Sequence, residues 1–299
     1  MEIINKFLSF HLQLNHLKEG NNKLNNYGNL LNFLVIFLIN LQIISLSSEK
    51  TLTFKKLNLD SEISMTIIGG GEQFILTESF SGPLPDKIYV NGYYYGEKTK
   101  KVNGLSGNEN SIKINWNSPL TTCRIMFLGL SNIKNMDLSK FDASEVTDME
   151  GIFYGCTSLT TIDLRNFNTS SVTKMSFMFY NCNSLVYLNL GNFNTSLSTN
   201  MVAMFYNCSQ LTSLDLSSFD TSQVTDMDSF FNNCSSLQFV IINNLNTSLV
   251  NNMYGLFYNC RSLTSIDLSN FDTSLVTFMR AMFGECHNLI SLNLSTFDT

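Results

Sequence analysis

Four aspartates of this 299-residue chain recur at multiples of one spacing, and carboxylates in such a row could bind a cation. We place them in one outward strand column together with two asparagines: Asp137, Asp163, Asn189, Asp215, Asp267 and Asn293. A Ca²⁺ site needs about six to eight oxygen ligands around the ion. The spacing alone supplies no such shell. We therefore interpret the column as a solvated acidic face and expect no metal site.

A catalytic centre is not expected either. The only histidines are His11, His16 and His287, and the first two fall in residues 1–48, which predict a signal segment. No nucleophile, base and orienting acid converge in the sequence. The glycines 69–71 lack the Lys-Ser/Thr pair that follows a phosphate-binding loop, so they predict a turn between strands. We expect a protein that is not an enzyme and that uses no cofactor.

A 26-residue repeat is the strongest signal in the chain. Three columns of apolar residues keep this step without interruption: Cys156, Cys182, Cys208, Cys234, Cys260 and Cys286; Met149, Met175, Met201, Met227, Met253 and Met279; Phe153, Phe179, Phe205, Phe231, Phe257 and Phe283. A fixed period of about 20 to 50 residues is typical of stacked repeats, in which each unit buries its apolar side against its neighbours. We expect these columns to form the structural core.

The cysteine column admits more than one interpretation. Seven cysteines in an exported chain favour a disulfide framework. Side chains of neighbouring repeats point the same way, however, which suits a ladder of buried thiols better than disulfides between adjacent repeats. Zinc is disfavoured, because no two cysteines have only two to four residues between them.

Each repeat predicts a strand, a turn and a short helix. Residues 172–182 place apolar side chains at offsets 3, 6, 7 and 10 from Val172, which is one stripe of a helix. Residues 185–190 read L-x-x-L-x-L, with the last two leucines on one face of a strand. Asn-Thr-Ser at 194–196 is typical of turns and helix N-caps. The predicted fold class is an α/β solenoid.

The sequence divides into three parts. Residues 1–48 contain the apolar run Asn29–Ser48 and predict a signal peptide or signal anchor, with a buried helix as the alternative. Residues 49–119 predict a small β-rich domain that caps the repeats, because Asn91-Gly92 stands between two β-rich runs. Residues 120–299 form the repeat array, with a degenerate first repeat and a truncated last one. We expect further repeats, and a membrane anchor, beyond Thr299.

The charge distribution argues against nucleic acid as a partner. The net charge is −6, and from Leu120 onward 7 Lys and Arg stand against 14 Asp and Glu. Binding to nucleic acid requires cations that displace phosphate counterions. An acidic array of this kind has no basic stripe to supply them.

Six Asn-x-Ser/Thr sequons occur, at Asn168, Asn194, Asn207, Asn233, Asn246 and Asn293. Three of them alternate in register with aspartates, namely Asn168, Asn194 and Asn246 with Asp142, Asp220 and Asp272. Asparagine and aspartate both form hydrogen-bonded turns, so their alternation at these positions is explained without glycans. Glycosylation is not implied by the pattern and stays open.

The stretch CSQLTSLDLSSFDTSQVTDMDSFFNNC, residues 208–234, closely resembles the BspA-type leucine-rich repeats of bacterial and protist surface proteins. The resemblance covers roughly residues 62–299, and the segment that ends in NSPLTTC is similar to the leader of such arrays in ciliate-type surface proteins. The first unit departs from the pattern, with Cys123 in the methionine column and Leu130 in the cysteine column. The resemblance implies a leucine-rich-repeat solenoid with an extracellular adhesion or receptor role.

Two functions follow as hypotheses. The first is a secreted or surface-displayed module that binds another protein or a glycan through its strand face. The second is a structural coat protein that associates laterally with copies of itself. For the binding site we select the positions where the outward columns turn apolar, Tyr187, Phe239 and Ile241, together with Asp163, Asp215 and Asp267. Membrane association would come from the N-terminal apolar segment or from a C-terminal anchor.

Overall fold

The computed structural model describes residues 41–46, 52–56 and 61–298, and the chain divides into two compact units, Met1–Leu59 and Asp60–Thr299. In the first unit, β1 (Leu41–Leu46) pairs antiparallel with β2 (Leu52–Lys56). Of the predicted signal segment, residues 1–48, only residues 41–46 are described, and they form β1; residues 1–40 and 47–48 lie outside the described residues. Across the described ranges, no helix has the length and apolar character needed to cross a membrane.

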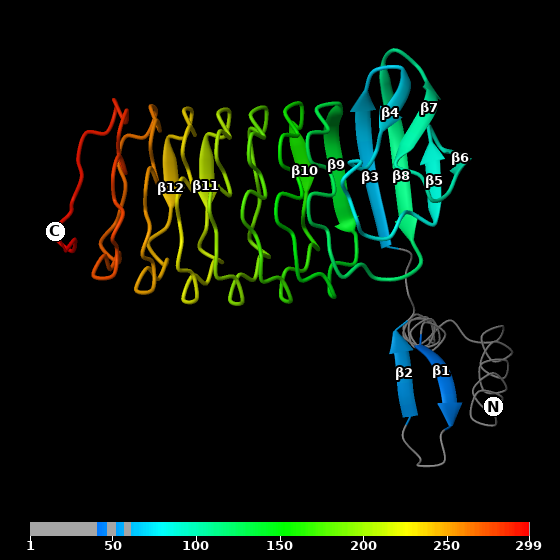
Figure 1. The fold of residues 1–299 in the computed structure, drawn as a ribbon, viewed down its shortest axis with the longest axis horizontal. Coiled ribbons are helices and arrows are strands. Elements are labelled where there is room, and N and C mark those ends of the chain that lie inside the picture. The colour runs from blue at the N-terminus through cyan, green and yellow to red at the C-terminus, as the bar shows by residue number, and fades with distance from the viewer. Residues whose placement is uncertain (1–40, 47–51, 57–60, 299) are drawn as a thin grey trace, which may run out of the picture. The chain divides into compact units, whose positions relative to one another are not determined.

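The second unit begins with a six-stranded mixed sheet in the order β10-β9-β3-β8-β5-β6 (Figure 1). Its strands are β3 (Ser61–Ile68), β5 (Lys87–Val90), β6 (Tyr93–Gly96), β8 (Glu109–Trp116), β9 (Ile133–Lys140) and β10 (Thr161–Asp163). A smaller sheet pairs β4 (Gly71–Phe74) with β7 (Lys101–Leu105). Side chains alternate between the two faces of a strand. In β3, Ile63, Met65 and Ile67 are therefore buried while Glu62, Ser64 and Thr66 lie on the outer face.

The hairpin between β5 and β6 forms where the sequence predicts it. Asn91 and Gly92 make the two-residue turn, with φ angles of 51° and 86°. Both angles are left-handed, as a type I′ turn requires, and this turn matches the twist of the two strands. The turn fixes the pairing of Tyr89 with Tyr94, so the tyrosines of β6 lie at the free edge of the sheet and Tyr89 lies on the neighbouring strand.

Beyond β9, the chain winds into coils of 26 residues stacked along the unit (Figure 1). Backbone N–H groups of one coil donate to carbonyls of the next, as from Gly151 to Ser176 at 2.9 Å and from Phe177 to Val202 at 2.9 Å. Strand segments are short: β10 pairs parallel with β9, and β11 (Ser213–Asp215) pairs parallel with β12 (Phe239–Ile241). The other parallel contacts between coils are isolated bridges, such as Asp226 with Asn252.

The predicted α/β leucine-rich-repeat solenoid, with one short helix in each repeat, is wrong. The described part of the chain contains no helix, and its strands lie in small sheets, so the fold is β-rich. The reason lies in residues 172–182. Phe177 and Asn181 have left-handed φ angles of 58°, which interrupt a helix. Tyr180 and Cys182 donate to carbonyls three residues earlier, and the apolar stripe is made by consecutive turns.

Two stacks of aromatic rings run through the core. In the first, rings from Phe127 to Phe283 repeat once per coil, with neighbouring centroids 5.2 to 5.9 Å apart. The second starts at Trp116 in β8, whose ring meets Phe141 edge-on at 6.0 Å, and continues through Phe167, Phe193 and Phe219. Trp116 thus joins the core of the six-stranded sheet to the core of the coils.

The predicted core columns are buried almost throughout. Met175, Met201, Met227, Phe179, Phe205 and Phe231 are at most 1% exposed. Cys156, Cys182, Cys208, Cys234 and Cys260 are 0% exposed and free, and Cys286 is half-buried. Each of these thiols donates to a carbonyl 29 residues earlier, as Cys208 Sγ does to Phe179 at 3.2 Å. Burial raises the pKa of the Cys208 thiol to about 12, which suits a structural role.

Candidate binding face

One polar face runs without a break from the edge hairpin into the coils. Residues paired across a sheet place their side chains on the same side. Tyr89 pairs with Lys113, Lys113 with Ser64, Ser64 with Asp137, and Asp137 with Asp163. This row crosses β5, β8, β3, β9 and β10 in order. The predicted Asp and Asn column of the coils is therefore continuous with the outer face of the six-stranded sheet.

The Asp and Asn column has a local structural task. Each side chain accepts a hydrogen bond from the backbone N–H two residues later, at 2.8 to 3.1 Å, for Asp137, Asp163, Asn189, Asp215, Asp267 and Asn293. This is the Asx turn, which asparagine and aspartate form equally well. The hydrogen bond from the Ser217 backbone lowers the pKa of Asp215 below its ordinary value.

These carboxylates do not converge on a cation. Asp163 is paired with Arg165, whose guanidinium reaches its Oδ2 at 2.6 Å. Asp215 and Asp267 are exposed and stand on separate coils. Within residues 41–46, 52–56 and 61–298, no group of three or more His, Cys, Asp or Glu is placed to hold a metal ion. The column shapes the turns that follow the strands.

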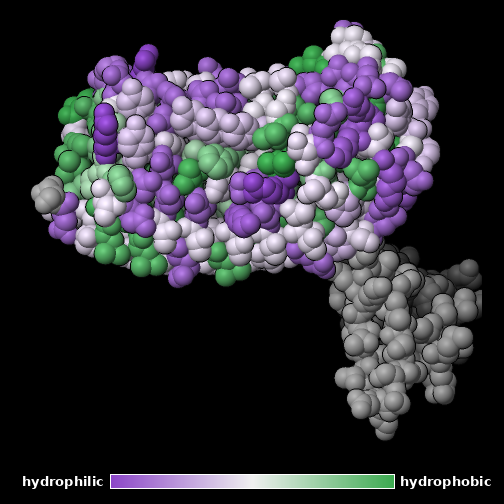
Figure 2. Space-filling view, in the orientation of Figure 1, coloured by the Kyte–Doolittle hydropathy of each residue, from purple (hydrophilic) through white to green (hydrophobic). Residues whose placement is uncertain are grey.

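Three side chains break the polar character of the face, and we call Tyr187, Phe239 and Ile241 the apolar patch. Their exposed fractions are 66%, 55% and 40%, although each is a large hydrophobic residue. Phe239 pairs with Ser213, and Ile241 with Asp215, so both stand in the outward columns. Figure 2 shows one face of the molecule, where hydrophilic colours dominate the coils and hydrophobic colour is confined to separate clusters.

Ile241 is the informative member of the patch. It occupies the column whose other members accept an N–H in the Asx turn, and an isoleucine side chain has no atom that can accept a hydrogen bond. The coil at Ile241 therefore gives up one local hydrogen bond and exposes an apolar side chain instead. Both changes disfavour the folded coil. A binding role for the patch would account for their presence.

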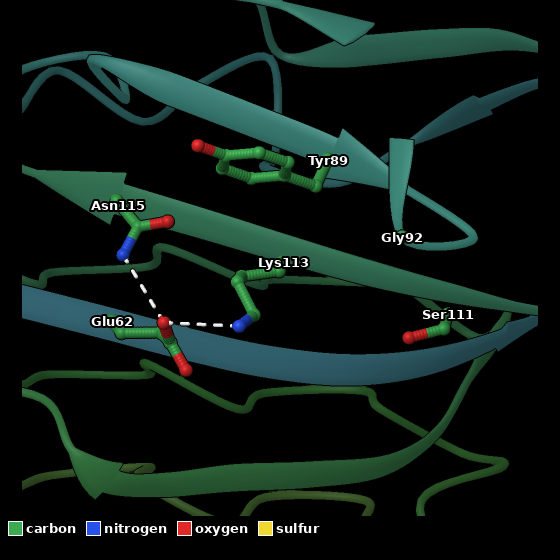
Figure 3. Close-up of a pocket in the computed structure, with 6 residues that line it drawn as sticks. All are labelled: Glu62, Tyr89, Gly92, Ser111, Lys113 and Asn115. Carbon is green, nitrogen blue, oxygen red and sulfur yellow. Dashed lines mark hydrogen bonds and ion pairs between the residues drawn. The ribbon is translucent and has the colours of Figure 1, made fainter. Parts of the chain in front are cut away.

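A groove lies on the sheet part of the same face. Glu62, Tyr89, Gly92, Ser111, Lys113 and Asn115 line it, and its volume is about 400 Å³. Figure 3 shows the Tyr89 ring beside its own strand β5 on one side and Glu62 on the other, where Asn115 and Lys113 both point to the carboxylate. Asn115 Nδ2 and Lys113 Nζ each lie 3.3 Å from Glu62 Oε2, and Lys140 Nζ lies 3.4 Å from Oε1.

The electrostatics of the groove centre on Glu62. Burial raises the pKa of this carboxyl, but the hydrogen bonds from Asn115 and Lys113 and the charges of Lys113 and Lys140 outweigh it. The pKa of Glu62 therefore lies below its ordinary value, and the group is ionised at neutral pH. The sequence did not reveal this groove, because Glu62 and Asn115 meet only through the pairing of β3 with β8.

Two further columns that are periodic in the sequence have structural roles that were not predicted. Buried threonines, at most 2% exposed, occur at Thr169, Thr195, Thr221, Thr247 and Thr273. Thr195 Oγ1 donates to the Asp220 carbonyl at 2.7 Å and accepts from the Asp220 N–H at 2.9 Å, which joins two coils. The second column holds the left-handed residues Gly129, Gly155, Asn181, Asn207, Asn233, Asn259 and Glu285.

The sequons and His287 have local partners. Asn168, Asn194 and Asn246 form Asx turns with the N–H two residues later, at 2.9 to 3.1 Å, as do Asp142, Asp220 and Asp272. Asn207 Nδ2 donates to Asn181 Oδ1 at 2.9 Å. His287 Nε2 lies 3.0 Å from Glu285 Oε2 on the surface. His11 and His16 lie outside the described residues.

The fold and this face define a β-rich protein of stacked 26-residue coils whose polar surface is interrupted by the apolar patch. Residues 100–214 and 199–299 match the family described as "Mycoplasma protein of unknown function, DUF285". The two matches together span about two thirds of the chain, and the chain belongs to this family. Searches of curated proteins and of solved structures found no match. The resemblance to BspA-type repeats stays a prediction.

Proposed function

We propose that this chain is a non-enzymatic binding module, secreted or displayed on a cell surface, that holds a partner protein on its strand face. The observation that carries the proposal is the apolar patch. In columns otherwise filled by Ser, Thr, Asp and Asn, the large side chains of Tyr187, Phe239 and Ile241 are 40% to 66% exposed. Exposed aromatic and apolar side chains that cluster in a polar surround are typical anchors of protein interfaces.

The geometry of the patch suits a protein surface better than a small molecule. Tyr187 and Phe239 stand two coils apart, which corresponds to about 10 Å at the usual strand spacing, with the small Ser213 between them. The backbone under Phe239 and Ile241 is fixed by the parallel pairing of β11 with β12, whereas Tyr187 lies in a coil segment outside the strands. A partner side chain can enter above Ser213 and contact both rings, and binding would cost little backbone ordering because the coils are already in place.

The test compares two double variants in the full chain. Tyr187→Ser with Phe239→Ser removes the two rings of the patch. Leu197→Ser with Leu249→Ser is the matched control, because these leucines are 50% and 43% exposed, also stand two coils apart and lie outside the two outward columns. Binding of each protein to intact source cells, and the solution mass of each protein alone, are measured.

We expect the wild type and the leucine control to bind cells equally, and the patch variant to lose at least about tenfold in affinity, the effect of removing a typical anchor residue. Equal binding by all three proteins would exclude the patch as the binding site. Self-association of the wild type that disappears only in the patch variant would favour the structural coat function instead.

A further inference from the structure

The groove on the outer face of β3, β8 and β5 has two sides of different chemistry. On one side the Tyr89 ring lies beside its strand β5, and on the other the side chains of Glu62, Lys113 and Asn115 form a hydrogen-bonded cluster (Figure 3). Its volume of about 400 Å³ falls at the lower end of the range for small-molecule sites, about 300 to 1,000 Å³. The groove has room for one small molecule or for the end of a larger one.

The charges around the groove argue against an anionic ligand. Lys113 and Lys140 both form ion pairs with Glu62, at 3.3 and 3.4 Å. A phosphate or carboxylate would have to draw these ammonium groups from Glu62 and would then lie beside its negative charge. The side chain of Glu62 is only 16% exposed, so this carboxylate cannot turn fully into solvent. A neutral ligand avoids this repulsion.

The remaining groups match a molecule that has one apolar face and a rim of hydroxyls. The Tyr89 ring offers an apolar surface that ends in a polar hydroxyl. Opposite it, the carboxylate of Glu62 accepts hydrogen bonds, and the amide of Asn115 donates and accepts them. A pyranose ring presents C–H groups on one face and hydroxyl groups around its edge.

We propose that this groove binds a neutral pyranose, as a free sugar or as the end of a glycan, with the sugar ring packed on Tyr89 and its hydroxyls bonded to Glu62 and Asn115. The site is separate from the apolar patch, because every lining residue lies in the six-stranded sheet or its β5–β6 turn. Failure of the proposed protein-binding function would leave this site unaffected, and the reverse also holds.

The experiment is saturation-transfer difference NMR on the full chain with the methyl pyranosides of glucose, galactose, mannose and N-acetylglucosamine. At least one glycoside should receive saturation at its ring C–H protons, with a dissociation constant on the order of 1 mM, as expected for a ligand of this size. Tyr89→Ala should weaken binding about tenfold by removing the ring contact, and Tyr89→Phe should retain most of it.

The controls use the same hairpin and the same groove. Tyr93→Ala is the matched control, because Tyr93 is 81% exposed in the same hairpin and does not line the groove. Ser111→Tyr fills the groove from an exposed strand position and should abolish binding even if Tyr89→Ala does not fold. The fluorescence of the single tryptophan, Trp116, which is 1% exposed in the same sheet, reports whether each variant is folded.

Three results would overturn the proposal. The first is that none of the four glycosides receives saturation at concentrations above the expected dissociation constant. The second is that folded Ser111→Tyr protein binds the glycosides as the wild type does. The third is that inorganic phosphate, and none of the glycosides, shifts the side-chain NMR signals of Lys113 and Lys140, which would assign the groove to anions.

Discussion

The six-stranded sheet and the stacked coils satisfy their backbone hydrogen bonds around one apolar core in different ways. In the sheet, β3 pairs with β8 along all eight of its residues, and each of these contacts occurs once. In the coils, the backbone N–H at a given position of the repeat donates to a carbonyl of the following coil, and the equivalent hydrogen bond recurs in each repeat. A contact that is repeated leaves a periodic trace in the sequence, whereas a contact made once leaves none.

The two regions also differ in what they present on their shared face. The sheet presents a groove in which one carboxylate, two lysines and an amide are bonded to one another. The coils present small polar side chains that form turns, interrupted by the apolar patch. A local departure from a repeated pattern is easier to detect than a site built from unrelated strands, so only the patch could be found without the structure.

The largest expected effect tests whether the coils can be destabilised without destabilising the six-stranded sheet. Met227→Ala should lower the free energy of unfolding by about 2 to 5 kcal/mol, as is typical when a buried methionine is truncated, because Met227 is 1% exposed. Repeats interact mainly with their neighbours, so the loss should be local. Hydrogen exchange should therefore speed up in the coils around residues 201–260 and much less in β3 and β8.

Gln223→Ala is the control for this change, because Gln223 is exposed in the same coil. It should change the free energy of unfolding by less than about 0.5 kcal/mol, the usual range for surface positions. If Met227→Ala accelerated hydrogen exchange equally in the sheet and in the coils, the two regions would unfold as one unit. The expectation that the loss of stability stays local to the coils would then be wrong.

This contrast explains how much of the fold was predictable. The core columns and the Asn91-Gly92 turn were predicted from residue types and spacing; most of the column residues are buried, and Asn91 and Gly92 have left-handed φ angles. The helix prediction was wrong because an apolar stripe at offsets 3, 6, 7 and 10 fits consecutive turns as well as a helix. The periodic Gly and Asn at the positions of Gly155, Asn181 and Asn207 indicate left-handed residues, and they could have excluded the helix.

The next effect tests the bonds between coils. Thr195→Val keeps the volume of the side chain but removes both hydrogen bonds to the Asp220 backbone. Thr195 is 0% exposed, so its hydroxyl is the buried partner that the Asp220 N–H and C=O lose. The free energy of unfolding should fall by about 1 to 3 kcal/mol, the cost of an unsatisfied buried group, in urea denaturation.

Thr212→Val is the matched control, since Thr212 is exposed in the following coil. The sheet contains no repeated bond of this kind among its described strands, so the threonine effect should be confined to the coils. A Thr195→Val protein as stable as the wild type would show that the threonine column does not stabilise the stack, and that backbone bonds alone hold neighbouring coils together.

A smaller effect tests the left-handed column that replaced the predicted helix. Asn207 has a φ angle of 54° and donates through its side chain to Asn181. Asn207→Ala and Asn207→Gly both remove this hydrogen bond, but only alanine resists the left-handed backbone. Asn207→Ala should therefore be less stable than Asn207→Gly by about 1 kcal/mol in paired urea denaturation curves. A helix at this position would reverse the order, because alanine is the better helix former.

The smallest expected effect is a shift in the pKa of one tyrosine in a stack of tyrosine rings on the coils. Tyr180 lies between Tyr154 and Tyr206, with ring centroids 4.3 and 4.5 Å away. Burial, and then its two tyrosine neighbours, raise the pKa of Tyr180 to about 12. The neutral phenol is therefore favoured in the folded chain, while the unfolded chain ionises at its ordinary pKa of about 10.

The sign of the pH dependence follows from this difference. The contribution of Tyr180 to stability is fully present below about pH 10, the unfolded pKa, and it is lost as the pH rises towards the folded pKa of about 12. In an ultraviolet titration of tyrosinate, the difference between wild type and Tyr180→Phe should show one group that ionises near pH 12. A difference curve centred near pH 10 would mean that the stack is open in solution, and the coils would then be less tightly ordered at this edge than in the core.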